Sequence, residues 1–188
     1  MQEVKKIVII GPESTGKSTL CKQLAEHYNT LWCPEYAREY LHEHGKEYTY
    51  DDLFKIAKGQ LRVEQEYIDK IQNSKFKIQN NNLLFIDTNM YVMKVWCEFV
   101  FEKCHQFILD EIAMRKYDLY LLCYIDLPWV EDELREYPDL ESREKLYHIF
   151  KDILVNQEVP WVEISGNNVQ RSSAAVKAVD NIIFSLPF

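Results

Sequence analysis

The sequence lacks the features that mark several large protein classes. It contains no run of 18 apolar residues, and the nearest candidate, residues 83–101, is interrupted by Asp87, Lys94 and Glu98, so no membrane-spanning helix is expected. Basic residues are scarce, because 22 Lys and Arg stand against 30 Asp and Glu and give a formal net charge of −8. This acidic balance argues against a general nucleic-acid-binding or anionic-membrane surface. Any positive charge needed to bind phosphate must therefore be local.

Paired cysteines, repeats and linkers are missing as well. The five cysteines are odd in number and include no Cys-x-x-Cys pair, which favours small buried thiols in a reducing compartment. No signal peptide precedes the first expected strand, so we expect a cytoplasmic protein. With no repeat or low-complexity tract, and a length sufficient for one full core, residues 1–188 are expected to form a single domain.

One glycine-rich stretch organises the rest of the chain. Residues 11–18, Gly-Pro-Glu-Ser-Thr-Gly-Lys-Ser, fit the Walker A or P-loop pattern between an apolar run and a helical leucine pattern. The two glycines let successive N–H groups curl around a phosphate, Lys17 can reach the β- and γ-phosphates, and Ser18 can offer its hydroxyl to Mg²⁺. The residues expected to bind ATP are Gly11, Glu13, Ser14, Thr15, Gly16, Lys17, Ser18 and Thr19.

The alternation of strand and helix patterns predicts the fold. Strands are expected at residues 4–10, 30–33, 83–86, 119–125 and 161–164, and helices at residues 19–28, 35–44, 53–71, 90–103, 106–115, 130–156 (broken near residues 137–138) and 169–184. This order predicts an α/β protein with a five-stranded parallel sheet flanked by helices. Ligands bind beyond the carboxyl ends of such strands. Four of the five ends carry polar groups, namely the P-loop, Glu35, Asp87 and Asp126.

Two of these strand ends offer carboxylates for phosphoryl transfer. Asp87 directly follows Leu-Leu-Phe-Ile, as a Walker B acid that holds Mg²⁺ would; the alternative is an Asp that only ends the strand and caps the next helix. Glu35 follows the second strand, and Arg38 shares its helical face. Together they could orient an acceptor hydroxyl and steady the transferred phosphate, or they could form a simple surface pair.

The charged segment after the fourth strand is expected to form a helical lid at approximately residues 128–145. It contains Pro138, few large apolar residues, and the two arginines Arg135 and Arg143, which could neutralise charge on the phosphates. A solvated helix–turn–helix with Glu–Arg pairs is the alternative. Nearby aromatic side chains such as Trp129 and Tyr36 could stack on a substrate ring or pack in the core.

Four motifs carry a family resemblance. Residues 11–18, 34–40 (Pro-Glu-Tyr-Ala-Arg-Glu-Tyr), 85–88 (Phe-Ile-Asp-Thr) and 128–135 (Pro-Trp-Val-Glu-Asp-Glu-Leu-Arg) resemble the nicotinamide riboside kinase domain of NadR-type proteins in order and approximate spacing over nearly the whole chain. The resemblance implies a P-loop fold like that of nucleoside and nucleotide kinases, and transfer of the γ-phosphate of ATP to a ribosyl hydroxyl.

The same resemblance assigns roles to individual residues. It implies that Lys17 and Ser18 hold phosphate and metal, and that Asp87 binds metal or the acceptor hydroxyl. It places Glu35, Tyr36 and Arg38 against the substrate, and Arg135 and Arg143 in the lid. Trp129 is a further candidate contact with the substrate, because its ring could stack on the substrate ring.

The chain also departs from the family. It has no room for the adenylyltransferase domain that precedes the kinase in NadR-type proteins. Pro34 replaces an expected aromatic residue, and Asn89 stands where a second Asp is frequent. The identity of the ring in the substrate is therefore left open. Another vitamin-like alcohol such as thiamine, or another nucleoside, is an alternative acceptor.

A regulatory P-loop ATPase without a small-molecule acceptor is the competing function. Such a protein would lack a pocket for a second substrate. Glu35, Arg38 and the lid segment favour the presence of such a pocket, and so favour the kinase. A GTPase is disfavoured, because no Asn-Lys-x-Asp base-reading motif is found. We expect ATP and a nucleoside-like acceptor as ligands, with no nucleic acid or membrane partner; the oligomeric state and the choice of Glu35 or Asp87 as catalytic base are left open.

Overall fold

A computed structural model describes residues 3–73 and 82–184. Five parallel strands form one sheet, β1 (Lys5–Ile10), β2 (Leu31–Cys33), β3 (Leu83–Asp87), β4 (Leu119–Cys123) and β5 (Trp161–Ile164), in the order β2-β3-β1-β4-β5. Every residue of β3 and β4 is buried, as expected for central strands covered on both faces. The predicted α/β class with a five-stranded parallel sheet is confirmed.

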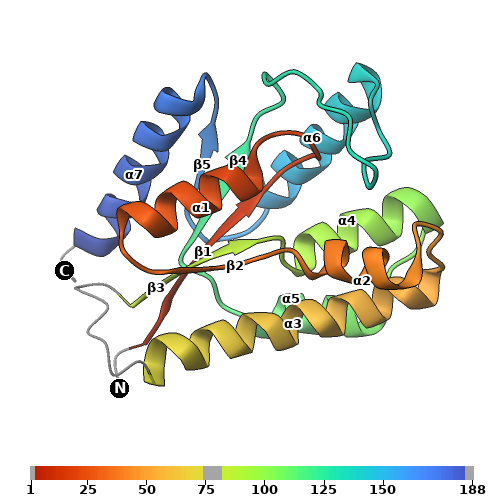
Figure 1. Cartoon of the computed structure of the whole chain (residues 1–188), viewed down its shortest axis with the longest axis horizontal. Coiled ribbons are helices and arrows are strands. Elements are labelled where there is room, and N and C mark those ends of the chain that lie inside the picture. Colours follow the sequence, from red (N-terminus) through yellow and green to blue (C-terminus); the bar gives the residue numbers. More distant parts are fainter. Residues whose placement is uncertain (1–2, 74–81, 185–188) are drawn as a thin grey trace.

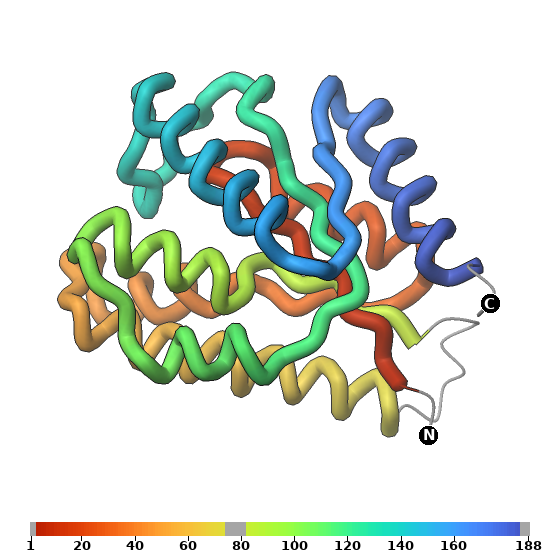
Figure 2. The backbone as a smooth tube through the Cα atoms, turned by 180° about the vertical axis from the view of Figure 1, so that it is seen from behind, coloured from red at the N-terminus to blue at the C-terminus, as the bar shows by residue number. Residues whose placement is uncertain are grey.

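Helices cover both faces of the sheet (Figures 1 and 2). They are α1 (Lys17–His27), α2 (Tyr36–His44), α3 (Tyr50–Asn73), α4 (Met90–Phe101), α5 (Gln106–Met114), α6 (Leu140–Val155) and α7 (Asn168–Phe184). The helices α1 and α7 pack on one face through residues such as Leu24 and Val179, against Ile9 and Leu121. The other face is covered by α3, α4 and α6. Each fully buried aliphatic side chain stabilises the fold by about 1.5–3 kcal/mol.

Helix α3 begins three residues earlier than the sequence pattern indicated. Residues Tyr50 to Asp52, which precede the expected helix, form its first turn. The cause is a reciprocal cap: the Thr49 backbone N–H donates to Asp52 Oδ2 at 2.9 Å, and the Asp52 N–H donates to Thr49 Oγ1 at 3.3 Å. Such a cap satisfies N–H groups that the helix itself cannot.

The prediction of a helical lid is wrong for its first half. Residues 128–139 are irregular, and helix α6 begins only at Leu140. Proline disfavours helical geometry in the residue before it, and Pro138 is followed by Asp139, whose side chain caps α6 by accepting the Ser142 N–H at 2.7 Å. We call residues 128–139 the lid loop; Figure 1 shows the connection between β4 and α6 extending past the end of β1.

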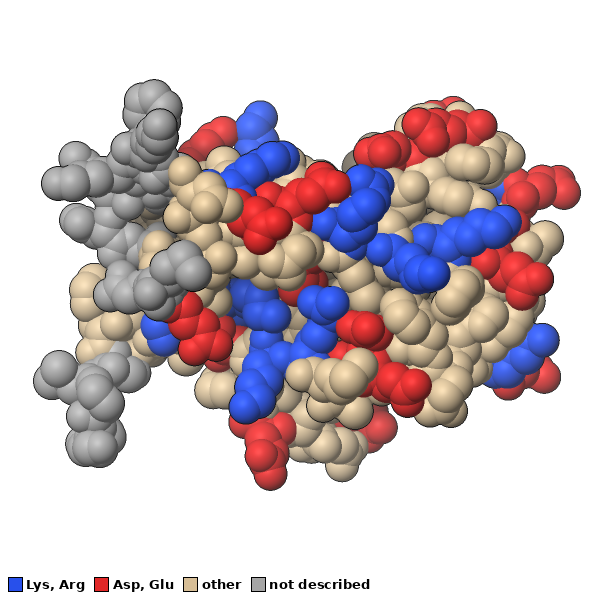
Figure 3. All heavy atoms as spheres, turned by 90° about the horizontal axis from the view of Figure 1, so that it is seen from below, with Lys and Arg blue, Asp and Glu red and all other residues tan. Residues whose placement is uncertain are grey.

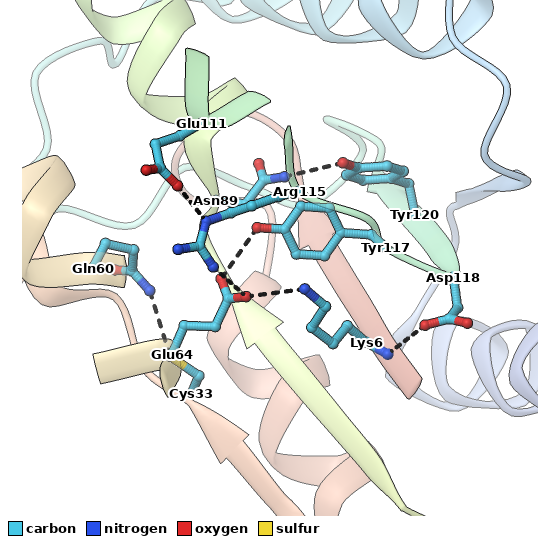
Figure 4. Close-up of polar contacts among 10 residues, drawn as sticks. All are labelled: Lys6, Cys33, Gln60, Glu64, Asn89, Glu111, Arg115, Tyr117, Asp118 and Tyr120. Atoms are coloured by element: carbon cyan, nitrogen blue, oxygen red, sulfur yellow. Dashed lines mark hydrogen bonds and ion pairs between the residues drawn. The ribbon is translucent and has the colours of Figure 1, made fainter. Parts of the chain in front are cut away.

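A buried charged network ties α3 to the sheet (Figure 4). Glu64 of α3 is fully buried; it accepts from the Tyr117 hydroxyl at 3.1 Å and pairs with Lys6 Nζ at 3.4 Å and Arg115 Nη1 at 3.5 Å. A buried carboxylate without such partners would cost several kcal/mol. The network therefore fixes the long helix α3 against β1 and the end of α5.

None of the helices in the described ranges has the length and apolar character that a membrane span requires. All five cysteines are free thiols, and four of them are buried, as expected. On the face shown in Figure 3, acidic and basic side chains are interspersed.

Candidate functional site

The P-loop connects β1 to α1 with a backbone that requires its two glycines. Gly11 has φ +138°, and a Cβ atom there would lie 2.7 Å from the carbonyl oxygen of Cys123 in β4. Gly16 has φ +80° and is the N-cap of α1. Both conformations disfavour other residues, and the second places Lys17 and Ser18 in the first turn of α1, at the positive end of the helix dipole.

Side chains within the P-loop stabilise its curled shape. The buried Thr15 hydroxyl donates to the Pro12 carbonyl at 2.7 Å, and Lys17 Nζ donates to the same oxygen at 2.9 Å. Lys17 thus lies over the loop in the position from which a phosphate could replace the carbonyl as its partner.

Arg171 of α7 supports the P-loop from outside, and sequence reasoning missed it. Its buried guanidinium donates to the carbonyls of Thr15 at 3.0 Å, Tyr124 at 2.9 Å and Gly166 at 2.8 Å, and it pairs with Asp126. Asp126, one of the four polar strand ends, therefore serves this support and does not line the cavity. No pattern in the sequence marks an arginine near the start of the last helix as a partner of Thr15, 156 positions earlier.

Asp87 lies at the end of the strand that pairs with the P-loop strand. It ends β3, which pairs directly with β1, and Asp87 stands opposite Ile9 in the register. The carboxyl group is buried, and its Oδ1 atom has no hydrogen-bond partner. Burial and the nearby Glu35 carboxylate raise the pKa of Asp87 to about 6, while Lys17 and a hydrogen bond with Ser18 oppose the shift. An unsatisfied buried carboxylate oxygen next to a hydroxyl fits a cation ligand.

Glu35 lies near Asp87, just after the end of β2, the edge strand that pairs with β3. It is the N-cap residue of α2 without a capping side chain, so its carboxylate is free to point elsewhere, and it accepts from the Thr88 hydroxyl at 3.3 Å. Gln60 of α3 fixes this turn, because it accepts the Tyr36 N–H at 2.8 Å and donates to the Pro34 carbonyl at 3.3 Å; its contact with Cys33 is visible in Figure 4.

Arg38 contacts the lid loop rather than Glu35. Its Nη1 atom reaches across to both carboxylate oxygens of Asp132, at 3.1–3.2 Å. The simple Glu–Arg surface pair considered from the spacing is therefore not what the structure shows. Arg38 links the helix on the Glu35 side of the site to the lid loop.

Two P-loop side chains, those of Ser14 and Glu13, accept hydrogen bonds from the lid loop. Ser14 Oγ accepts from the Val130 N–H at 3.0 Å and from Arg135 Nη1 at 3.3 Å. The Glu13 carboxylate accepts the backbone N–H groups of residues 136 and 137. Burial raises the pKa of Glu13, and these hydrogen bonds partly oppose the shift. Arg135 is thereby placed beside Ser14 of the P-loop.

Three of the expected substrate or lid residues lie outside the cavity. The Tyr36 ring packs on Gly59 of α3, where an added Cβ would lie 1.9 Å from the ring. Arg143 is buried, donates to the Leu127 carbonyl at 3.1 Å and stacks on Trp129. Trp129 also lies beneath the Arg135 guanidinium, 5.8 Å from its ring centroid. These contacts give all three side chains protein partners outside the cavity.

One continuous cavity of about 250 Å³ joins the P-loop to an apolar compartment. All eight residues expected to bind ATP line it, and so do Glu35, Arg38 and Arg135. Asp87 lies just beneath this lining. The compartment beyond is lined by side chains from α2, α4, α6 and the lid loop, namely Ala37, Leu41, Val92, Val95, Trp96, Leu134, Tyr137, Leu146 and Phe150. Tyr137 was not foreseen, since in the sequence it marked only a helix break.

Comparisons with known proteins agree with this geometry. The chain is 31% identical over 166 residues, 86% of its length, to the trifunctional NAD biosynthesis/regulator protein NadR of Escherichia coli (strain K12), and it spans 38% of the length of that relative. The resemblance to NadR-type proteins is thereby confirmed.

Two solved structures share the fold. A NadR protein in complex with NR superimposes with a TM-score of 0.75 at 24% identity, covering 98% of this chain and 52% of that one. Deoxyadenosine kinase from M. mycoides with bound dATP superimposes with a TM-score of 0.59 at 11% identity, covering 94% of this chain and 99% of that one. A family model described as AAA domain matches residues 6–171, from the P-loop strand to the arginine that supports the P-loop. The chain belongs to the AAA domain family.

Proposed function

We propose that this protein is an ATP-dependent kinase that transfers the γ-phosphate to a ribosyl hydroxyl of nicotinamide riboside or a closely similar nucleoside. The observation that carries the proposal is the single cavity in which a P-loop opens into an aromatic and aliphatic compartment, with Glu35 and Arg38 at the junction. The NadR relative and the NadR structure with bound NR support the choice of acceptor.

The compartment suits a planar ring attached to a sugar. Trp96 and Tyr137 provide aromatic surfaces, and the aliphatic residues of α4 and α6 provide an apolar wall. Pro34, which replaces an expected aromatic residue, is not part of this lining; its carbonyl accepts from Gln60 instead. The aromatic surface for the acceptor is therefore supplied from other elements, so the departure at Pro34 does not weigh against the nicotinamide ring.

The residues at the junction can perform the chemistry. Lys17, Arg38 and Arg135 place three positive groups around the P-loop end of the cavity, where they would stabilise the transferred phosphate. Glu35 is the group we expect to orient the acceptor hydroxyl and receive its proton, because it lines the cavity whereas Asp87 lies beneath it.

Mg²⁺ would be held by Ser18 and Asp87. The unpartnered, buried Oδ1 atom of Asp87 beside the Ser18 side chain fits this role, and the ion would shield charge between the phosphates of ATP. The five free thiols support a cytoplasmic setting for the reaction.

A regulatory ATPase is the second candidate function, and the P-loop is the one feature that supports it. The apolar compartment argues against it, because a switch ATPase has no use for a second-substrate pocket next to its phosphates.

The proposal is tested by incubating the protein with ATP and Mg²⁺ and, separately, nicotinamide riboside, thiamine and the common nucleosides, with each product identified by mass. We expect phosphorylated nicotinamide riboside, and none with Lys17→Ala. Preferential phosphorylation of thiamine would overturn the acceptor assignment. Hydrolysis of ATP at the same rate with and without every acceptor would favour the regulatory ATPase.

A further inference from the structure

Tyr48 lies outside the cavity lining but contacts one of its walls. The residue precedes α3, and its hydroxyl accepts from Trp96 Nε1 of α4 at 2.7 Å. The two rings also meet edge to face, with centroids 4.8 Å apart. Trp96 lines the compartment proposed for the acceptor ring, so the Tyr48 hydroxyl holds one side of that compartment in place.

The same hydroxyl reaches the lid loop. It donates to Glu136 Oε2 at 2.9 Å, and the backbone N–H of Glu136 donates to both carboxylate oxygens of Glu13 at 2.9 and 3.2 Å. A continuous chain of hydrogen bonds therefore runs from Trp96 through Tyr48 and Glu136 to Glu13 of the P-loop.

The polarity of this chain is fixed by chemistry. The indole N–H can only donate and a carboxylate can only accept, so the phenol between them must accept from one and donate to the other. The phenol is half-buried, and burial raises its pKa above the ordinary value, so it keeps its proton at neutral pH. A hydrogen bond to a carboxylate is among the stronger kinds in proteins.

We propose that Tyr48 is a positioning residue that couples the acceptor compartment to the lid loop. Its hydroxyl holds the Trp96 ring and the Glu136 side chain in one arrangement, so a ring bound against Trp96 favours the position of the lid loop over the P-loop. The inference rests on the proposed kinase function for its kinetic consequences, but not for its structural ones.

The test compares Tyr48→Phe with wild type. The variant keeps the ring that packs on Trp96 and removes only the hydroxyl. We expect the KM for nicotinamide riboside to rise about tenfold, the loss typical of a hydrogen bond to a charged group, with the KM for ATP changed less than about twofold. Amide hydrogen exchange of peptides from residues 128–139, measured without ligands, should become faster.

Tyr28→Phe is the matched control. Tyr28 is also half-buried, and its hydroxyl donates to a carboxylate, that of Asp180, at 2.8 Å, but it lies between α1 and α7, away from the lid loop. This variant should leave both the acceptor KM and the exchange of residues 128–139 unchanged.

A double-mutant cycle with Glu136→Gln measures the coupling. If Tyr48 and Glu136 act as one unit, the double variant should lose no more acceptor kcat/KM than the worse single variant, whereas independent effects would multiply. Equal exchange of the lid loop in Tyr48→Phe and wild type would overturn the inference whatever the enzyme's substrate. An inactive wild type with faster exchange in Tyr48→Phe would instead refute the proposed function and leave the coupling standing.

Discussion

Replacement of Asp87 by Asn should make the protein more stable and less active at the same time. Asp87 is buried at the end of β3, one of its carboxylate oxygens has no partner, and the Glu35 carboxylate lies close enough to repel it. In the absence of metal and nucleotide, the native state must therefore hold a negative charge in unfavourable surroundings. Asn keeps the shape of the side chain and removes the charge.

The size of the effect follows from the pKa. A rise from the ordinary 3.8 to about 6 corresponds to roughly 3 kcal/mol, because each pKa unit is about 1.4 kcal/mol. Between these two values the folded protein binds a proton that the unfolded chain releases. The stability contributed by this proton is fully present below pH 3.8 and is lost as the pH rises through 6. The amide of the Asp87→Asn variant is neutral throughout this range, so the variant loses no stability in this way.

The measurement is urea unfolding of wild type and Asp87→Asn between pH 5 and pH 8, with EDTA and without nucleotide. We expect the variant to be more stable at pH 8 by up to roughly 3 kcal/mol, with about half of that difference at pH 5. Asp139→Asn is the control, because Asn replaces Asp well as a helix cap and its effect should not change between pH 5 and pH 8, where the Asp139 carboxylate, whose pKa is lowered by Ser142, stays ionised. A variant that is less stable than wild type at pH 8, or a difference independent of pH, would refute this account of Asp87.

Three further predictions separate chemistry from support. Lys17→Ala should lower kcat by at least ~100-fold in a protein that still folds, with some loss of stability at neutral pH because the Lys17 ammonium favours the buried Asp87 carboxylate; a variant with near-normal turnover would contradict the P-loop assignment. Glu35→Gln should raise the acceptor KM while ATP·Mg²⁺ binding, measured by calorimetry, is retained; unchanged acceptor kinetics would leave Asp87 as the candidate base. Arg143→Ala should cost about 2 kcal/mol of stability through its lost buried contacts, whereas Arg135→Ala should mainly lower kcat; the reverse pattern in paired denaturation and kinetic assays would exchange their roles.

The sequence was informative wherever function depends on local pattern. The P-loop is one contiguous motif whose glycines have a steric reason to be there, and its flanks form the expected strand and helix. Asp87 follows a continuous apolar run that is typical of a buried strand. Because carboxyl ends of parallel strands meet at one edge, the meeting of Glu35, Asp87 and the P-loop followed from chain order alone.

The rest depends on contacts between distant segments, which no local pattern records. The family resemblance placed Tyr36 against the substrate but could not say that Gly59 leaves a gap for its ring. The lid loop looked helical because its composition is charged, yet its backbone N–H groups are satisfied by Glu13 and Ser14, more than 100 residues earlier. From the sequence Trp96 could equally have been core, and only the structure shows that it lines the cavity.

The support that Arg171 gives to the P-loop has a practical meaning for protein engineering. Its guanidinium joins the last helix to the P-loop through the Thr15 carbonyl, so α7 supports the P-loop even though none of its described residues lines the cavity. A shortened version that ends after β5 would keep every strand of the sheet and still lose the hydrogen bond from Arg171 that supports the P-loop. For the same reason, a split protein divided between β5 and α7 should regain ATP binding only when its two fragments associate, which would make ATP binding a reporter of fragment assembly.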